Sequence, residues 1–170
     1  EPGQEILLST RSGQSIRFRE DNVRLMGRSA YGVRGIGLEG DDEVVSVDVL
    51  SPGRSILTVS EKGQGKRSDL DEYRVQTRGG KGIITMKLSD KTGPVVGTVQ
   101  VADDDEVMMV TDRGRLIRLR VSDIRVIGRN TQGVRLLDVD DGERVVAVVQ
   151  PGDWADAGPA LAAELTLEVA

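Results

Sequence analysis

The sequence predicts an all-β fold made of three similar four-stranded antiparallel units, and three observations lead to this expectation. Equivalent residues recur at spacings of 50 and then 51, as Gly13, Gly63 and Gly114 show. Each repeat contains β-rich runs on both sides of a glycine turn, such as ILLSTRSGQSIRF. A helical period is suggested only at residues 160–165, near the end of the chain. The body of the chain is therefore expected to be almost wholly β.

The same spacing holds for polar and apolar positions throughout the three repeats. The polar and glycine triplets are Arg17, Arg67 and Arg118; Arg24, Arg74 and Arg125; Arg28, Arg78 and Arg129; and Gly32, Gly82 and Gly133. The apolar triplets are Ile6, Ile56 and Val107; Val33, Ile83 and Val134; and Val45, Val95 and Val146. Because so many positions keep one spacing, each unit is expected to have the same plan.

Four strands are expected in each unit, in a fixed order. The first two form a hairpin around the glycine turn, as in SILTVSEKGQGKR and EVMMVTDRGRLIRL. The third contains Val33, Ile83 or Val134, and the fourth is EVVSVDVL, PVVGTVQV or RVVAVVQ. Four strands in a repeat of this length are typical of a propeller blade, although the aromatic signatures of WD40 and kelch blades are missing. We expect blades over residues 1–51, 52–103 and 104–151, followed by an acidic tail over residues 152–170.

Composition excludes several classes of function. The chain has no Cys and no His, which excludes disulfides, thiolate or imidazole metal sites and Ser-His-Asp triads. No apolar run reaches the ~20 residues of a membrane span, so a soluble cytoplasmic protein is expected, and the start at Glu1 suggests a fragment. The net charge of −5 argues against nucleic acid, but the tail carries four carboxylates and no Lys or Arg. The body is nearly balanced, which leaves room for a basic face.

Three segments carry a resemblance to a known family. GRSAYGVRGI, QTRGGKGII and GRNTQGVRLL resemble the C-terminal β-pinwheel domain of DNA gyrase A, and residues 105–134 resemble its final blade. The resemblance covers roughly residues 4–150. It implies a β-propeller or β-pinwheel, here half of a six-bladed wheel, in which neighbouring blades exchange strands. It also implies non-specific binding and wrapping of duplex DNA, in support of ATP-dependent negative supercoiling by a type II topoisomerase holoenzyme of gyrase A and gyrase B subunits.

One departure from the family concerns the gyrase-A box, which has the form QRRGGKG and belongs to the family's first blade. The segment QTRGGKG differs from it at Thr77 and lies in the middle repeat. We interpret this segment as the equivalent turn of a later blade. The determinant of supercoiling that the box carries is therefore expected to be missing.

The recurrent arginines are the expected DNA-binding residues, because repetition of blades places equal sequence offsets at equal positions around a rim. Arg17, Arg67 and Arg118 are expected to form the main curved row, so that replacing all three by Ala should weaken binding to every sequence alike. Guanidinium groups suit phosphate oxygens and provide affinity without reading bases. The complete set is Arg17, Arg24, Arg28, Arg34, Lys66, Arg67, Arg74, Arg78, Lys81, Arg118, Arg125, Arg129 and Arg135.

Other motifs are interpreted as structural. Gly35, Gly37 and Gly40 spell GxGxxG, but no strand, turn and helix surround them. The run Gly63 to Arg67 lacks the Ser or Thr that would hold magnesium in a phosphate loop. The acidic clusters lack EF-hand spacing and are expected in solvated turns. Tyr31 and Tyr73 are expected to be packing residues and not nucleophiles.

No catalytic residue, metal or cofactor is expected on this chain, and neither nuclease, ATPase nor DNA-relaxing activity. The expected partners are duplex DNA and the remaining gyrase A and gyrase B subunits, with no membrane. Two alternatives stay open: the C-terminal domain of the corresponding topoisomerase IV protein, and a propeller that binds proteins through its acidic turns and tail.

Overall fold

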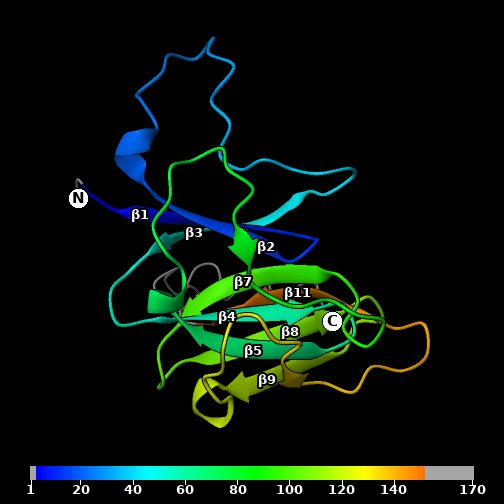
Figure 1. Ribbon diagram of the computed structural model, residues 1–170. Helices are drawn as coiled ribbons and strands as arrows, with labels where there is room; N and C mark the ends of the chain where they lie inside the picture. Colours follow the sequence, from blue (N-terminus) through cyan, green and yellow to red (C-terminus); the bar gives the residue numbers. More distant parts are fainter. Residues whose placement is uncertain (1–2, 152–170) are drawn as a thin grey trace, which may run out of the picture.

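The computed structural model describes residues 3–151, which fold into three antiparallel sheets that follow one another as blades (Figure 1). The strands are β1 (Glu5–Thr10), β2 (Gln14–Arg19), β3 (Val44–Leu50), β4 (Ser55–Ser60), β5 (Gln64–Asp69), β6 (Ile83–Ile84), β7 (Val95–Val101), β8 (Glu106–Thr111), β9 (Leu116–Arg120), β10 (Val134–Arg135) and β11 (Val145–Val149). One-turn 3-10 helices follow three of them: η1 (Glu20–Asn22), η2 (Leu70–Glu72) and η3 (Val121–Asp123). The prediction of an all-β propeller fold is confirmed, and no helix in the described range is long and apolar enough to cross a bilayer.

In the first two sheets, the outer strand comes from the following repeat. The strand orders are β3-β1-β2-β6, β10-β5-β4-β7 and β11-β8-β9. Ile83 of β6 lies opposite Ser15 of β2, and Val134 of β10 lies opposite Gly65 of β5. The strand expected at Val33 does not form, and that prediction is wrong, because no preceding sheet edge is present among residues 3–151 to receive it. The third sheet has three strands within this range, because no following repeat is described there to supply a fourth.

Glycine at the hairpin turns is required by the turn and, in two blades, by a neighbour. Gly63 has a φ of +75°, and a Cβ on it would lie 2.2 Å from the carbonyl oxygen of Leu137. Gly13 likewise has a φ of +82° and would place a Cβ 2.6 Å from the carbonyl oxygen of Met86. The third turn glycine, Gly114, has a φ of +80° but no neighbouring atom within 4 Å. The turn conformation favours glycine in all three repeats, and in the first two a side chain would also clash with the crossover segment of the next repeat.

The apolar core lies between the sheets. Leu57 and Val59 of β4 belong to one fully buried cluster with Val107 and Met109 of β8. Leu7 of β1 packs in a second cluster with Ile56, Leu70 and Tyr73 from the second repeat. Complete burial of an aliphatic side chain of this size is worth about 1.5–3 kcal/mol. Apolar contacts between neighbouring blades therefore contribute to the stability of each blade.

Strands β3, β7 and β11, which we call the inner strands, lie at one edge of their sheets and pack β3 against β7 and β7 against β11. The backbone N–H of Val95 donates to the carbonyl of Arg11 at 2.9 Å, and that of Val145 donates to the carbonyl of Glu61 at 2.8 Å. The side chain of Arg11 also bridges to Glu61 at 2.5 Å. The strands predicted around Val45, Val95 and Val146 are confirmed. The predicted acidic tail and the helical run at residues 160–165 lie outside the described residues.

Candidate nucleic-acid interface

Most of the predicted arginines lie on three crossover segments, which we define as residues 23–36, 73–86 and 124–137. In Figure 1 the green second segment rises to meet the first sheet, and the yellow third segment meets the second sheet. Near the start of the second segment, the N–H of Gln76 donates to the carbonyl of Arg17 at 2.7 Å. In the third segment, the N–H of Ile127 donates to the carbonyl of Arg67 at 2.8 Å. The second and third crossover segments are therefore bonded to the preceding blade both at these residues and at their short strands.

Arg17 and Arg67 lie in the joints between blades. One guanidinium nitrogen of Arg17 donates to the carbonyls of Leu70 and Tyr73, both at 2.9 Å, and its side chain pairs with Glu5. Arg67 repeats this contact and donates to the carbonyls of the next repeat. The side chains are 14% and 6% exposed, whereas that of Arg118 is 64% exposed and pairs with Glu106. These three arginines do not form the exposed row that the spacing predicts, and their role in DNA binding stays a prediction.

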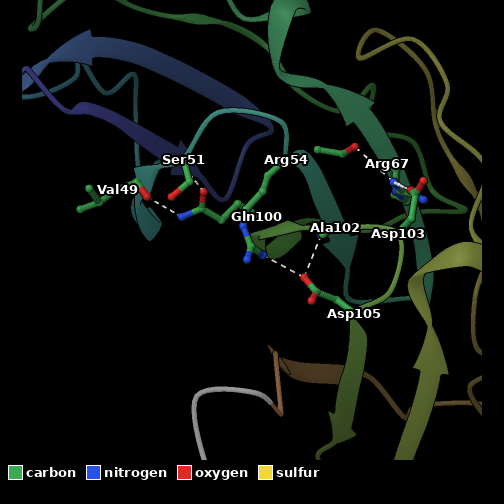
Figure 2. Close-up of polar contacts among 9 residues, drawn as sticks. Val49, Ser51, Arg54, Arg67, Gln100, Ala102, Asp103 and Asp105 are labelled. Carbon is green, nitrogen blue, oxygen red and sulfur yellow. Dashed lines mark hydrogen bonds and ion pairs between the residues drawn. The ribbon is translucent and has the colours of Figure 1, made fainter. Parts of the chain in front are cut away.

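Arg67 has the most extensive set of contacts. Its acceptors are the carbonyl of Val121 at 3.1 Å, the carbonyl of Ile124 at 3.3 Å, Asp103 Oδ1 at 2.5 Å and Ser55 Oγ at 3.3 Å. Figure 2 shows Asp103 meeting Arg67 from the linker between the second and third repeats. Because burying a guanidinium is costly unless it is paired, this set of acceptors stabilises the joint.

The linkers between repeats also make polar contacts (Figure 2). Gln100 reaches back to the first repeat, where its amide nitrogen donates to the carbonyl of Val49 and its oxygen accepts from the N–H of Ser51 at 2.9 Å. Arg54 pairs with Asp105 at 2.9 Å. The angle between successive blades is therefore set by several bonds and not by apolar packing alone.

A second repeated arginine also acts between neighbouring repeats. Arg78 donates to the carbonyl of Asn22 at 2.7 Å and to that of Arg34 at 2.9 Å. One repeat further on, Arg129 donates to the carbonyls of Glu72 at 3.1 Å and Ile84 at 2.7 Å. These contacts fix each crossover segment to the previous one, and they leave part of each guanidinium at the surface.

Lys66 is buried, contrary to the expectation that it extends a basic row. Its ammonium donates to the carbonyls of Gly128 and Arg129 on the third crossover segment, the first at 2.9 Å. Burial lowers the pKa of Lys66 to about 8, with nearby Glu72 opposing the shift and Arg129 adding to it. Lys66 thus anchors a crossover segment, and sequence position alone did not reveal this.

One repeated set of arginines is exposed to solvent. Within residues 3–151, the side chains of Arg24, Arg74 and Arg125 form no hydrogen bond or ion pair with another residue. Each lies directly after the residue that closes its 3-10 turn, so the three occupy equivalent points on successive blades. We call these three residues the rim row. Their unpaired guanidiniums are suited to phosphate oxygens.

Other predicted basic residues flank the rim row on the crossover segments. Arg28, Arg34, Lys81 and Arg135 are exposed. Lys81 pairs with Glu39, and Arg135 pairs with Asp138 at 2.7 Å. Exposed surface pairs of this kind contribute little to stability and can be exchanged for another anion. Lys87 and Arg120 are exposed as well, but they fall outside the repeated positions, so the spacing could not identify them.

The two tyrosines differ in environment. Tyr73 is buried, and its hydroxyl bonds Thr85 Oγ1 at 2.7 Å, which confirms the expected packing role. Burial raises the pKa of Tyr73. Tyr31 is fully exposed on the first crossover segment, so the expectation of packing is wrong for this residue. Within residues 3–151, no group of three or more acidic side chains is arranged to hold a metal ion.

The repeated blades and the strands exchanged between them define a β-propeller domain built from sequence repeats. The sequence model of the family described as "DNA gyrase C-terminal domain, beta-propeller" matches residues 4–51, 54–102 and 105–150. The chain belongs to this family.

Among individual proteins, the chain is similar to DNA gyrase A. It is 48% identical over 152 residues to the gyrase A protein from Salmonella typhimurium, covering 89% of this chain and 17% of the relative. It is 45% identical over 155 residues to that from Escherichia coli, covering 89% and 18%. The chain thus spans less than a fifth of the length of these relatives.

Two solved structures have the same fold. The DNA gyrase A C-terminal domain superposes with a TM-score of 0.81 at 28% identity, covering 87% of this chain and 50% of that one. The C-terminal domain of DNA topoisomerase IV superposes with a TM-score of 0.82 at 29% identity, covering 87% and 46%. The resemblance to the gyrase A domain that the sequence motifs suggested is confirmed.

Proposed function

We propose that this chain binds duplex DNA without sequence preference and helps to wrap it, as part of gyrase A. The observation that carries the proposal is the rim row, which repeats an exposed, unpaired arginine once per blade at Arg24, Arg74 and Arg125. A row of this kind supplies phosphate contacts at separated, fixed points and has no geometry for reading bases. The partners in this role are duplex DNA, the rest of gyrase A, and gyrase B.

The joints between blades explain how such a row could bend DNA. Bending 20–30 base pairs by 40–90° costs of order 1–6 kcal/mol, which phosphate contacts must offset. If those contacts could move freely, the protein would bind DNA without bending it. Arg17 and Arg67 hold the blades at fixed angles through carbonyl contacts, so they support DNA binding by positioning the rim row. Lys66, Arg78 and Arg129 fix the crossover segments in the same way.

The remaining predicted residues complete the proposed surface. Arg28, Arg34, Lys81, Arg118 and Arg135 are exposed, and we assign them secondary phosphate contacts. The chain itself carries out no chemistry in this proposal. It supports ATP-dependent negative supercoiling by a cytoplasmic holoenzyme, whose ATPase and cleavage sites lie on other parts. Topoisomerase IV remains the second candidate, because its C-terminal domain superposes equally well.

The test is the salt dependence of DNA binding, measured at low salt with a triple variant in which Arg24, Arg74 and Arg125 are replaced by Ala. Loss of three phosphate contacts should make the slope of log affinity against log salt shallower by up to ~2.7, about 0.9 for each contact. The matched control replaces Lys62, Lys91 and Arg113, three exposed cations in turns, by Ala.

Two outcomes would contradict the proposal. Equal slopes in the parent and the rim variant would show that the rim row does not contact DNA phosphates. No binding by the parent at low salt would favour a protein-binding propeller.

A further inference from the structure

Tyr31 differs from the other aromatic residues within the 3–151 range. Phe18 and Tyr73 are 2% and 1% exposed and lie in the apolar clusters, whereas Tyr31 is fully exposed on the first crossover segment. A tyrosine ring can bury a large area and keep its hydroxyl hydrated, which is why exposed tyrosines are enriched where proteins meet partners. Tyr31 is therefore the aromatic side chain of the described residues that is open to a partner.

The exposure of Tyr31 does not depend on whether another blade precedes the first. By the repeat spacing, its equivalents are Lys81 and Gln132. Both lie on crossover segments that pair with a preceding sheet. The side chain of Lys81 is nevertheless 80% exposed, and Gln132 is exposed as well. Pairing of the first segment with a preceding sheet would therefore leave Tyr31 at the surface.

The glycine that follows each of these residues explains their exposure. Gly32, Gly82 and Gly133 have φ values of +80°, +77° and +78°. At Gly82 and Gly133 a Cβ would lie 2.4 Å and 2.6 Å from the carbonyl oxygens of Ser15 and Gly65 on the preceding sheet. The chain thus touches the sheet at the glycine, and the side chain immediately before it stays exposed. The first segment has the same glycine conformation beside its tyrosine.

The segments that carry these positions are strongly cationic. Each crossover segment contains three basic residues and no Asp or Glu. The basic residues are Arg24, Arg28 and Arg34; Arg74, Arg78 and Lys81; and Arg125, Arg129 and Arg135. In the second blade the place of Tyr31 is taken by Lys81, to which we assign a phosphate contact. A neutral ring in this place cannot neutralise a phosphate, but it suits the sugar and base surfaces that lie between phosphates.

We propose that Tyr31 packs its ring against the deoxyribose and base edges of duplex DNA where the duplex passes the first blade. The contact rests on the proposed DNA binding and adds a contribution of a different kind. Phosphate contacts release counterions, so they weaken as the salt concentration rises. An aromatic contact releases none, so the affinity that it adds does not depend on salt. The first blade thus holds DNA partly through an apolar contact that Lys81 and Gln132 do not provide in the other two blades.

The experiment measures the affinity of the whole chain for duplex DNA of mixed sequence at several low salt concentrations. Tyr31→Ala should weaken binding about fivefold at every concentration, the low end for loss of an aromatic contact with a base, and leave the slope of log affinity against log salt unchanged. Tyr31→Phe keeps the ring and should stay within about twofold of the parent. Tyr31→Lys copies the second blade and should steepen the slope by ~0.9.

Gln132→Ala is the matched control. It removes an exposed neutral side chain from the equivalent place in the third blade, so neither the affinity nor the slope should differ from those of the parent. Circular dichroism verifies that each variant is folded.

Four results would overturn the inference. Equal affinity of the parent and Tyr31→Ala, with a shallower slope in the rim variant, would leave the proposed DNA binding intact and assign the exposed ring to another partner, such as a protein. Equal losses in Tyr31→Phe and Tyr31→Ala would show that the hydroxyl makes the contact. A shallower slope in Tyr31→Ala would show that the variant disturbs neighbouring phosphate contacts. No binding by the parent would refute the proposed function itself, and this contact with it.

Discussion

Two sets of arginines repeat with the same spacing in this chain, yet they lie in opposite environments. Arg17 and Arg67 are enclosed between blades, where backbone carbonyls and carboxylates accept their hydrogen bonds. Arg24 and Arg74 lie seven residues further along and point into solvent without a partner among residues 3–151. Repetition of a residue therefore shows that its position matters in every blade, but not whether it faces the next blade or a ligand.

The difference arises from which side of the array each position faces. The arginines of β2 and β5 lie opposite Leu7 and Leu57, on the face that the next blade covers. The rim row follows the 3-10 turn, at the point where the chain leaves its own blade. A short distance along the chain thus separates an arginine held between blades from one that is exposed to solvent.

The largest expected effect distinguishes the two sets directly. Arg67→Ala should lower the free energy of unfolding by about 3–5 kcal/mol, because it leaves the carbonyls of two buried residues, Val121 and Ile124, without their donor, at about 1–3 kcal/mol each, and removes a buried side chain from the joint. Arg74→Ala should change it by less than about 0.5 kcal/mol, as is usual at exposed positions. Urea unfolding of both variants measures the difference. A similar loss of unfolding free energy in the two variants would contradict the difference between arginines held between blades and those of the rim row.

A second expected effect compares one turn in two blades. Gly63→Ala requires an unfavourable positive φ and also drives a Cβ into the Leu137 carbonyl, so a loss of about 2–4 kcal/mol is expected. Gly114→Ala has the same backbone strain but open space, so about 1–2 kcal/mol is expected. Thermal unfolding of the two single variants tests the ordering. An equal loss of stability in the two variants would mean that the segment around Leu137 shifts at little cost to accommodate the new Cβ.

The smallest expected effect concerns pH. The folded chain holds the Lys66 proton less tightly than the unfolded chain, since burial lowers the pKa of Lys66 from 10.5 to about 8. Between these values the unfolded state binds more protons, so stability should rise with pH. From pH 7.5 to 9.5 the gain should be about 1–2 kcal/mol.

Lys66→Met is the matched control for this pH effect. Its unfolding free energy should lack the rise, so the result is the difference between parent and variant across the same range. Staying below pH 10 avoids the titration of Tyr73, whose raised pKa acts in the opposite direction. A parallel pH dependence in the two proteins would mean that the ammonium of Lys66 is well solvated.

Much of the fold could be predicted because the repeat spacing aligns hairpin turns and strands in three copies. Spacing could not show that Ile83 and Val134 would pair outside their own repeats, because a two-residue strand has no periodicity that identifies its partner. Nor could it place Arg17 and Arg67 in the joints, since the backbone carbonyls that accept from them lie more than 50 residues away along the chain. The resemblance to the gyrase family supplied what local pattern could not, including the exchange of strands.

Because one strand is exchanged, the sequence repeat and the four-stranded sheet do not coincide: each complete sheet contains strands from two repeats. Deleting residues 52–103 would remove one hairpin and its inner strand, together with the strand that completes the first sheet. The next repeat would then bring Val134 to the same edge in place of Ile83, with an equivalent register. Whole repeats can therefore be gained or lost in evolution without leaving an internal sheet incomplete, whereas a break inside a crossover segment would damage two blades at once.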